Sequence, residues 1–215
     1  MYINEKALQY SQSGEGQFKS NGQNITLSKR ELGELYLPTG KIVANDPFFC
    51  YENEPFTVAV KPGSYPVAIF ITEYPSDKRI ALASLNFSGE LPIRWELAIT
   101  EQEELDQKNL TADEFYGYGV DSATGCFCDK AVIDMMANDE NYDLYAAIGS
   151  DFDASYDISI QYLLTTIFDY QLANITCFTS GWGDGSYPSY FGFDGQGDPC
   201  CLVTDFCIID NTDDR

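Results

Sequence analysis

The feature that most constrains the fold is a series of short apolar runs, each closed by a turn sequence. Residues 35–37 precede Pro38-Thr39-Gly40, and residues 41–44 precede Asn45-Asp46-Pro47. Runs of about 4–8 residues suit strands, whereas a helix needs about ten or more, and proline and glycine mark the turns between them. The spacing therefore predicts a succession of strands.

The same pattern continues along the chain. Residues 56–60 and 65–71 are joined by Pro62-Gly63 and predict a hairpin. Half-buried antiparallel strands are expected over residues 79–87 and over residues 93–99, where Arg94 and Glu96 alternate with apolar residues. Two further strands are predicted over 174–179 and 201–206.

Helical spacing is found only in the second half. Asp129 is placed to cap a helix that continues towards residue 137, and residues 155–170 predict a longer helix. The β-branched Thr165-Thr166-Ile167 keeps a buried strand open as the alternative for the second segment. The predicted class is α+β and β-rich, a mostly antiparallel sheet or sandwich with one or two helices in the second half.

The N-terminal residues differ in texture from the rest. Residues 1–30 are rich in Ser, Gln, Asn and Gly, so we expect a loosely ordered arm that buries little apolar area. Composition does not break after that point, which favours a single β-rich domain over residues 31–215.

Charge and composition exclude several functions. The 34 acidic residues outnumber the 12 basic ones, and the resulting net charge of -22 disfavours binding to nucleic acid or to anionic membranes. The first residues lack the basic and apolar pattern of an export signal, so a cytoplasmic location is expected. Histidine is absent, which removes the usual general base and the commonest metal ligand.

Cysteine spacing gives only a weak indication of metal. The chain holds 7 cysteines, and an odd number without an export signal predicts free thiols. Cys126 and Cys128 share one face of a predicted strand, where Cys200, Cys201 or Cys207 would have to complete a zinc site. Because paired ligands at the usual Cys-x₂₋₄-Cys spacing are missing, we favour buried cysteines, and we predict neither a metal nor another cofactor.

Three glycine-containing motifs fail as ligand-binding sites. Pro38-Thr39-Gly40-Lys41 lacks the first glycine and the Ser or Thr of a phosphate-binding loop, and Gly181-Trp182-Gly183-Asp184-Gly185-Ser186 lacks the last glycine of a dinucleotide fingerprint. Asp194-Gly195-Gln196-Gly197-Asp198 has too few ligands for calcium and is read as a hairpin turn.

Two segments carry more glycine and polar detail than packing needs, residues 115–127 and residues 180–192. A functional interpretation places both around one pocket, in which Asp121 and Asp184 face each other as acid and base, with Glu96 and Arg94 nearby. Ligand- or partner-binding residues would then be Trp182, Asp184, Tyr187, Tyr190, Asp121 and Arg94. The structural alternative is that both aspartates cap turns and the aromatic residues fill the end of a sheet.

Several ordered blocks resemble a bacterial family known only as a domain of unknown function. The likeness extends from about Leu35 to Phe206, and it implies no established reaction and no catalytic residue. The blocks that carry it are Leu37-Pro38-Thr39-Gly40-Lys41-Ile42-Val43-Ala44, Pro55-Phe56-Thr57-Val58, Pro62-Gly63-Ser64-Tyr65-Pro66-Val67, Arg94-Trp95-Glu96-Leu97-Ala98, Tyr118-Gly119-Val120-Asp121 with Thr124-Gly125-Cys126-Phe127, Ser180-Gly181-Trp182-Gly183-Asp184-Gly185 and Leu202-Val203-Thr204-Asp205-Phe206.

Two classes of function remain open besides a β domain with no dedicated pocket. The favoured one is a non-catalytic binding protein, such as an immunity protein or antitoxin that neutralises a basic toxin, because acidic charge speeds encounter with a basic partner and aromatic residues hold it. The alternative is a hydrolase that uses Asp121 and Asp184 on a sugar or a nucleotide-derived ligand.

Overall fold

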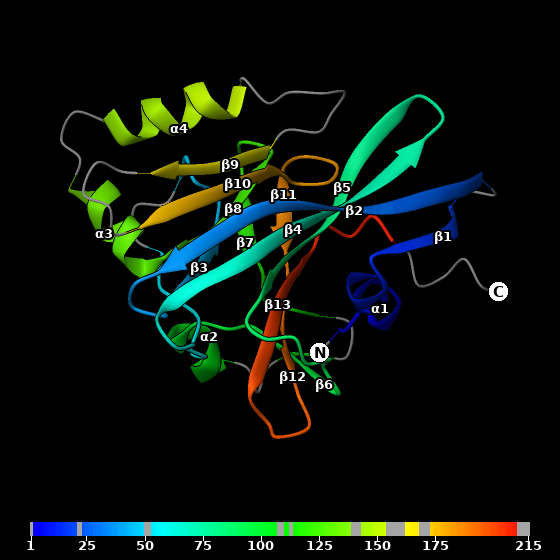
Figure 1. Ribbon diagram of the computed structural model, residues 1–215, viewed down its shortest axis with the longest axis horizontal. Helices are drawn as coiled ribbons and strands as arrows, with labels where there is room; N and C mark the ends of the chain where they lie inside the picture. The colour runs from blue at the N-terminus through cyan, green and yellow to red at the C-terminus, as the bar shows by residue number, and fades with distance from the viewer. Residues whose placement is uncertain are drawn as a thin grey trace.

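A computed structural model describes residues 2–20, 23–49, 53–106, 110–111, 114–138, 143–153, 162–167 and 173–209 (Figure 1). Its largest element is a sheet of seven strands in which every neighbouring pair is antiparallel. In spatial order the strands are β1 (Glu15–Ser20), β2 (Gln23–Leu37), β4 (Gly63–Tyr74), β5 (Asp77–Asn86), β13 (Pro199–Asp205), β12 (Ser189–Phe193) and β6 (Arg94–Leu97).

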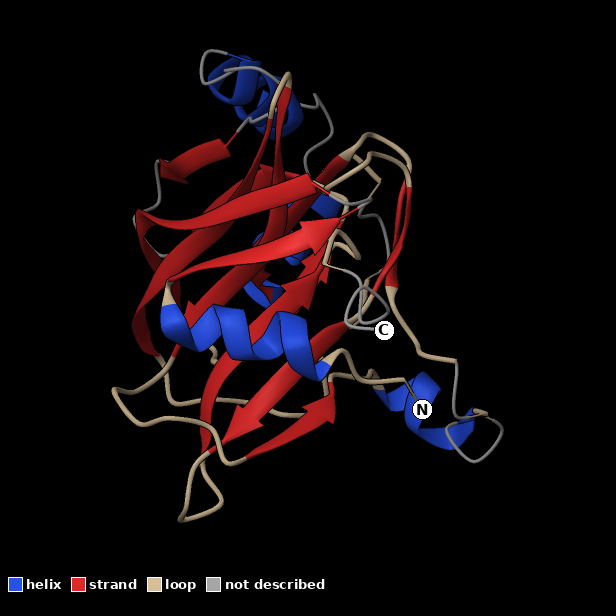
Figure 2. Cartoon of the chain, turned by 90° about the vertical axis from the view of Figure 1, so that its right-hand side faces the viewer, coloured by secondary structure: helices blue, strands red, loops and turns tan. Residues whose placement is uncertain are grey.

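A second sheet packs against the first. Its four strands, in spatial order, are β3 (Ile42–Asn45), β8 (Thr124–Asp129), β10 (Asn174–Thr179) and β9 (Tyr162–Ile167). Phe127 and Phe178 of this sheet belong to the same buried cluster as Leu35 and Phe70 of the large sheet. The main core therefore lies between the two sheets, whose strands Figure 2 draws in a view turned by 90°.

Two helices cover the outer face of the smaller sheet. These are α3 (Lys130–Ala137) and α4 (Asp143–Asp153), and their Val132, Ile148 and Phe152 pack with Cys126 and Cys177 in a second buried cluster. Side chains of a strand alternate between its faces, so the small sheet buries apolar residues on both sides. The predicted β-rich α+β class with antiparallel sheets and helices in the second half is confirmed.

Local expectations are confirmed where a capping or turn residue signals them. Asp129 is the N-cap of α3 and accepts a hydrogen bond from the Ala131 amide at 2.9 Å. Asp194 closes the hairpin between β12 and β13 by accepting from the amides of Gln196 and Asp198. Both use the short aspartate side chain in place of a backbone acceptor.

The structure of the N-terminal segment, residues 1–30, differs from the loosely ordered arm that we expect from its composition. In place of a loosely ordered arm, its described residues form helix α1 (Glu5–Ser13), β1 and the first part of β2. A few apolar residues are enough to pack this segment against the core, because Ala7, Leu8 and Ile25 are each fully buried. Composition shows only that the segment has few apolar residues. It does not show that these residues are positioned to face the core.

Two other local expectations are wrong. Residues 56–60 do not form a hairpin with 65–71, because Phe56 makes only an isolated bridge to Thr100 while β4 pairs with β2 and β5. The helix expected over 155–170 is replaced at Tyr162–Ile167 by strand β9, the alternative that its β-branched residues favour. Residues 155–161 and 168–170 of that segment lie outside the described residues.

The remaining elements complete the fold. A short helix, α2 (Glu101–Asp106), follows β6, and the small two-stranded sheet of β7 (Tyr118–Val120) and β11 (Gly185–Tyr187) joins the two glycine-rich segments. Within the described part of the chain, no helix is long and apolar enough to cross a membrane.

Candidate functional site

The two glycine-rich segments meet, as the functional interpretation expects. Gly185 of β11 pairs with Val120 of β7, and Tyr187 pairs with Tyr118. The approach needs glycine at residue 117, because a Cβ there would lie 2.6 Å from the backbone of Tyr187. Two segments about sixty residues apart in the chain are thus brought together by backbone pairing. Gly117 and Tyr118 from one and Ser189 from the other also line a cavity.

Asp184 and Asp121 each make a hydrogen bond to another residue rather than to each other. Both side chains are exposed, and Asp184 Oδ1 accepts a hydrogen bond from the Ala123 amide at 3.0 Å. Asp121 donates its own backbone N–H to Asp46 Oδ2 at 2.9 Å. Asp184 therefore caps a turn, as the structural alternative expects. Neither hydrogen bond favours acid–base chemistry.

Asp46 is the buried carboxylate that sequence reasoning missed at this site. Only 2% exposed, it accepts from the Asp121 and Ser122 amides on one oxygen and from the Ser122 hydroxyl and the Phe48 amide on the other. Such a carboxylate compensates for its burial by filling its acceptor positions. Its sequence signal is the Asn-Asp-Pro turn, which indicates a turn but not its distant partners.

Arg94 and Glu96 lie apart from the two aspartates. Both stand on β6, where they form an ion pair with each other, and the Arg94 guanidinium lies 4.2 Å from the centre of the Phe193 ring. Among the described residues, no hydrogen bond or ion pair links either of them to Asp121 or Asp184. The described contacts therefore do not link all four of these residues to one another.

Tyr187 and Tyr190 belong to the core. The Tyr187 hydroxyl donates to the Gly183 carbonyl at 2.7 Å, and the Tyr190 hydroxyl donates to the Tyr2 carbonyl at 3.1 Å. Burial raises the pKa of both phenols, so both stay neutral donors. Their contribution is to hold the Gly183 turn and the N-terminal residues in place, not to contact a partner.

Trp182 alone among the predicted aromatic residues is available to a ligand. Its side chain is 58% exposed at the tip of the loop between β10 and β11. The Tyr74 ring packs beside it at 5.7 Å between centroids, and the Arg79 guanidinium lies 4.8 Å from the indole centre. We call these three residues the Trp182 platform.

The platform is rigidly supported. Arg79 is bound to Asp77 by an ion pair at 2.6 Å and donates to the Gly181 carbonyl at 3.3 Å. The loop is closed by the Gly183 amide, which donates to the Ser180 carbonyl at 2.8 Å. Gly181 has a φ of +53°, and a Cβ there would lie 2.9 Å from Phe206, so the loop tolerates no other residue without moving.

A cavity of about 240 Å³ adjoins the platform. Trp182 and Tyr74 form one side, and residues from near both ends of the described chain, among them Asn4 and Cys207, form the other. The lining thus joins Tyr2 and Asn4 with Cys207, Ile208 and Ile209. The sequence gives no signal that these two ends meet.

Asn4 and Asp205 hold those two ends together beneath the cavity. Asn4 Oδ1 caps α1 by accepting from the Ala7 amide, while its Nδ2 donates to Asp205 Oδ2 at 3.0 Å and to the Ile209 carbonyl at 2.8 Å. Asp205 also accepts from the Cys207 amide. Complete burial raises the pKa of Asp205 to about 6, and the hydrogen bonds that it accepts from the Cys207 amide and from Asn4 oppose the rise.

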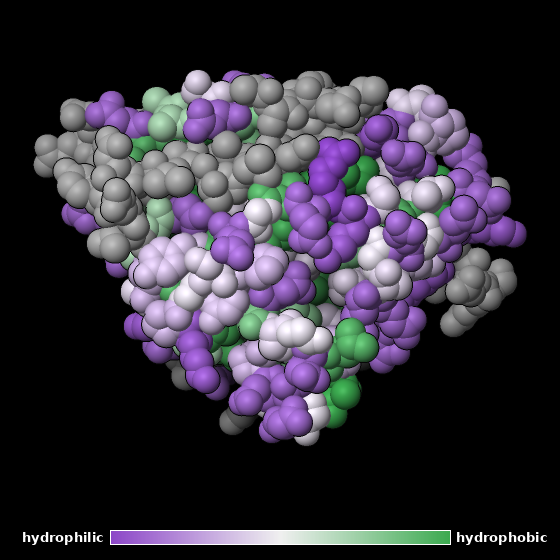
Figure 3. Space-filling view, viewed as in Figure 1, coloured by the Kyte–Doolittle hydropathy of each residue, from purple (hydrophilic) through white to green (hydrophobic). Residues whose placement is uncertain are grey.

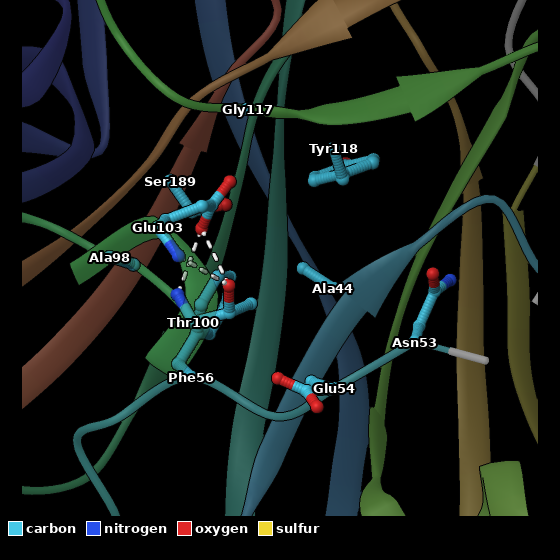
Figure 4. Close-up of a pocket in the computed structure, with 10 residues that line it drawn as sticks. All are labelled: Ala44, Asn53, Glu54, Phe56, Ala98, Thr100, Glu103, Gly117, Tyr118 and Ser189. Carbon is cyan, nitrogen blue, oxygen red and sulfur yellow. Dashed lines mark hydrogen bonds between the residues drawn. The ribbon is translucent and has the colours of Figure 1, made fainter. Parts of the chain in front are cut away.

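A smaller cavity of about 140 Å³ lies between β3, β7 and the start of α2 (Figure 4). Two carboxylates line it, Glu54, which is exposed, and Glu103, whose Oε2 accepts from both the amide and the hydroxyl of Thr100. Thr100 and Glu103 form the capping box of α2. This carboxylate therefore serves helix initiation.

The cysteines behave as buried apolar residues. Cys126, Cys128, Cys177, Cys200 and Cys201 are buried thiols, and Cys207 is an exposed one; Cys50 lies outside the described residues. Although the residue as a whole is exposed, the protein around its sulfur removes water from it and, together with the charge of Asp205, raises the pKa of the Cys207 thiol to about 12, which disfavours the reactive thiolate. Within the described ranges, no group of three potential metal ligands comes together.

The fold and site define a β-rich α+β protein with an exposed aromatic platform and buried aspartates that cap its turns. A family model described as a protein of unknown function (DUF4241) matches residues 35–204, so the chain belongs to the DUF4241 family. No curated protein and no solved structure matches the chain. The resemblance expected from the sequence blocks is confirmed at the level of the family.

Proposed function

We propose that this protein is a non-catalytic, acidic binding protein of the cytoplasm that neutralises a basic partner protein, as an immunity protein or antitoxin does. The observation that carries the proposal is the exposure of Trp182 on a rigid loop in a chain of net charge -22. Tryptophan is enriched among the few residues that supply most of the binding energy of protein interfaces.

Preorganisation supports this role for the platform. An interface side chain loses conformational entropy when a partner fixes it, at roughly 0.5–1.5 kcal/mol for a mobile one. Trp182 is already held between Tyr74 and Arg79, on a loop fixed by Ser180 and Gly183. Less of that entropy remains to be lost on binding.

The distribution of acids supports a basic partner. Asp46, Asp129, Asp194 and Asp205 are buried and accept hydrogen bonds from the chain itself. Asp184 stands two residues from Trp182 and is exposed, as is Asp121 in the paired segment. Exposed acids around an aromatic anchor accelerate encounter with a basic surface and favour its orientation.

The test uses the product of a toxin-like gene adjacent to this one, purified and titrated calorimetrically against the full chain. We expect binding that weakens as NaCl rises from about 50 to 300 mM, and Trp182→Ala to weaken it by about 30-fold. Phe49→Ala is the matched control, because Phe49 is an aromatic residue that is 54% exposed outside the platform. It should change the affinity by less than about twofold.

Two outcomes would contradict the proposal. One is failure of the pair to associate even at low salt, and the other is equal affinity of the Trp182→Ala and wild-type proteins. Thermal melting of each variant separates a lost contact from a lost fold, since the half-exposed indole contributes less to the core than a buried one.

A further inference from the structure

We propose that β6 is a self-complementary edge strand through which two copies of this chain pair antiparallel about a twofold axis. The inference concerns a surface remote from the Trp182 platform in the chain and does not depend on the proposed function. Figure 1 shows β6 at the lower end of the large sheet, beside β12.

The outer side of β6 is open, whereas the edge strands β1 and β3 each have a backbone carbonyl bonded by a residue outside the strand. In β1, the Gln17 carbonyl accepts a hydrogen bond from the Tyr10 hydroxyl at 2.9 Å, and in β3 the Ile42 carbonyl accepts from the Phe56 amide at 2.9 Å. Among the described residues, nothing outside the sheet bonds to the backbone of Arg94–Leu97. Open edges of this kind are the sites at which sheets extend.

The register identifies which backbone groups are open. Ala98 donates to the Ser189 carbonyl of β12, so alternate residues counted back from Ala98 face β12. Ile99 faces the other way, and its carbonyl accepts from the Thr57 amide at 2.8 Å. By the same alternation, Trp95 and Leu97 direct their amides away from the sheet.

The charges on β6 indicate that the strand added at its open edge is β6 of a second copy of this chain. If Trp95 lies opposite Trp95 of the second copy, Arg94 lies opposite Glu96 and Glu96 opposite Arg94. Within one copy these two side chains already pair on one face and are 48% and 52% exposed. Charged residues on an edge strand normally prevent pairing, but opposite signs two residues apart attract in this register.

Exposed apolar residues lie next to the same edge. Leu91 and Ile93 are 65% and 75% exposed, and they immediately precede β6. Figure 3 shows a mostly polar face with exposed apolar atoms near its lower end, where β6 lies in Figure 1. In the proposed register the Ile93 carbonyl accepts from Leu97 of the second copy, which brings these apolar side chains into the interface.

The experiment measures the mass of the full chain by sedimentation equilibrium from about 10 µM to 1 mM at low and high NaCl. We expect a dimer that strengthens as salt rises, because salt screens the repulsion between two copies of charge -22. Capture of a basic partner has the opposite salt dependence, so the two proposals fail independently. A wild-type protein that stays monomeric at about 1 mM would overturn the inference.

Charge reversal tests the register. Arg94→Glu and Glu96→Arg each place like charges opposite one another and should raise the dissociation constant by about tenfold or more, whereas the double variant R94E/E96R should return to within about threefold of wild type. Lys29→Glu is the control, because Lys29 pairs with Glu31 at 2.5 Å on β2. A double variant as weak as the single variants would exclude this pairing, and circular dichroism confirms that each variant is folded.

Discussion

At the scale of single residues, the loop after β7 is fixed by carboxylates that sequence reasoning assigned to chemistry or overlooked. Asp46 holds the amides of Asp121 and Ser122, and Asp184 holds the amide of Ala123. Ala123 itself has a φ of +54°. A left-handed conformation costs a non-glycine residue about 1 kcal/mol or more, so these hydrogen bonds maintain a strained position.

Replacing Ala123 with glycine should therefore stabilise the protein. Ala123→Gly removes the Cβ that makes the left-handed conformation unfavourable, and this gain exceeds the added entropy of the unfolded chain. We expect an increase of roughly 0.5 kcal/mol in the free energy of unfolding, measured by urea titration. Ala81→Gly, in the fully buried centre of β5, is the contrasting substitution and should destabilise. Equal losses in both variants would show that Ala123 is not strained.

At the scale of elements, the docking of α1 depends on one buried carboxylate. Asn4 caps the helix and donates to Asp205 at the end of β13. The pKa of Asp205 is raised from 3.8 to about 6, so the folded state binds this proton more tightly than the unfolded state. Its contribution to stability is present below about pH 4 and is lost as the pH rises towards 6.

The variant Asp205→Asn should remove this pH dependence. Between about pH 4 and 6 the free energy of unfolding of the wild type should fall relative to that of the variant by up to roughly 3 kcal/mol. The loss of one acceptor for Asn4 lowers the stability of the variant equally at each pH, so only the slope is diagnostic. Urea titrations at intervals across this range measure it, with Asp184→Asn as an exposed control. Parallel curves for wild type and D205N would contradict the assignment.

Elements were predictable from sequence where the signal is local. Asp129 at the start of α3 and the glycines of the β12–β13 turn act within a few residues. The strand Asn174–Thr179 matches its apolar run. Residues 56–60 have an equally good strand pattern but only an isolated bridge, because partner choice depends on the whole sheet.

The candidate site could also be predicted only where its signal is local in the sequence. The density of glycine and aromatic residues indicates that residues 115–127 and 180–192 are special, and β7 and β11 do pair. Which side chains are exposed does not follow from that pattern. Tyr190 is fully buried and Trp182 is 58% exposed, although both lie in the same segment. Contacts such as Asn4 with Asp205 join residues 201 positions apart and leave no local signature.

At the scale of the whole molecule, charge opposes the compact state. With a net charge of -22, the acidic side chains repel one another in the folded protein, and salt screens that repulsion. We expect the melting temperature at pH 7 to rise by several degrees as NaCl increases from about 10 to 200 mM. Dilute protein, at about 1 µM, keeps self-association from contributing.

Substituting tetramethylammonium chloride for NaCl distinguishes screening from specific cation binding. Screening depends on ionic strength and predicts the same rise with both salts. A rise seen with sodium alone would instead indicate that carboxylates bind the cation, and a melting temperature that falls with salt would show that attractive ion pairs outweigh the repulsion.

The cavity beside Trp182 has a practical consequence, because Tyr2 and Asn4 line it together with Ile208 and Ile209. A bulky label attached at Tyr2 or at Ile209 would therefore lie next to the indole and would shield it from an incoming macromolecule. A binding assay with such a label would then miss an interaction that the unlabelled protein makes. Labels inserted at the solvent-facing turn Asp194–Asp198, which lies in another part of the chain, avoid this obstruction.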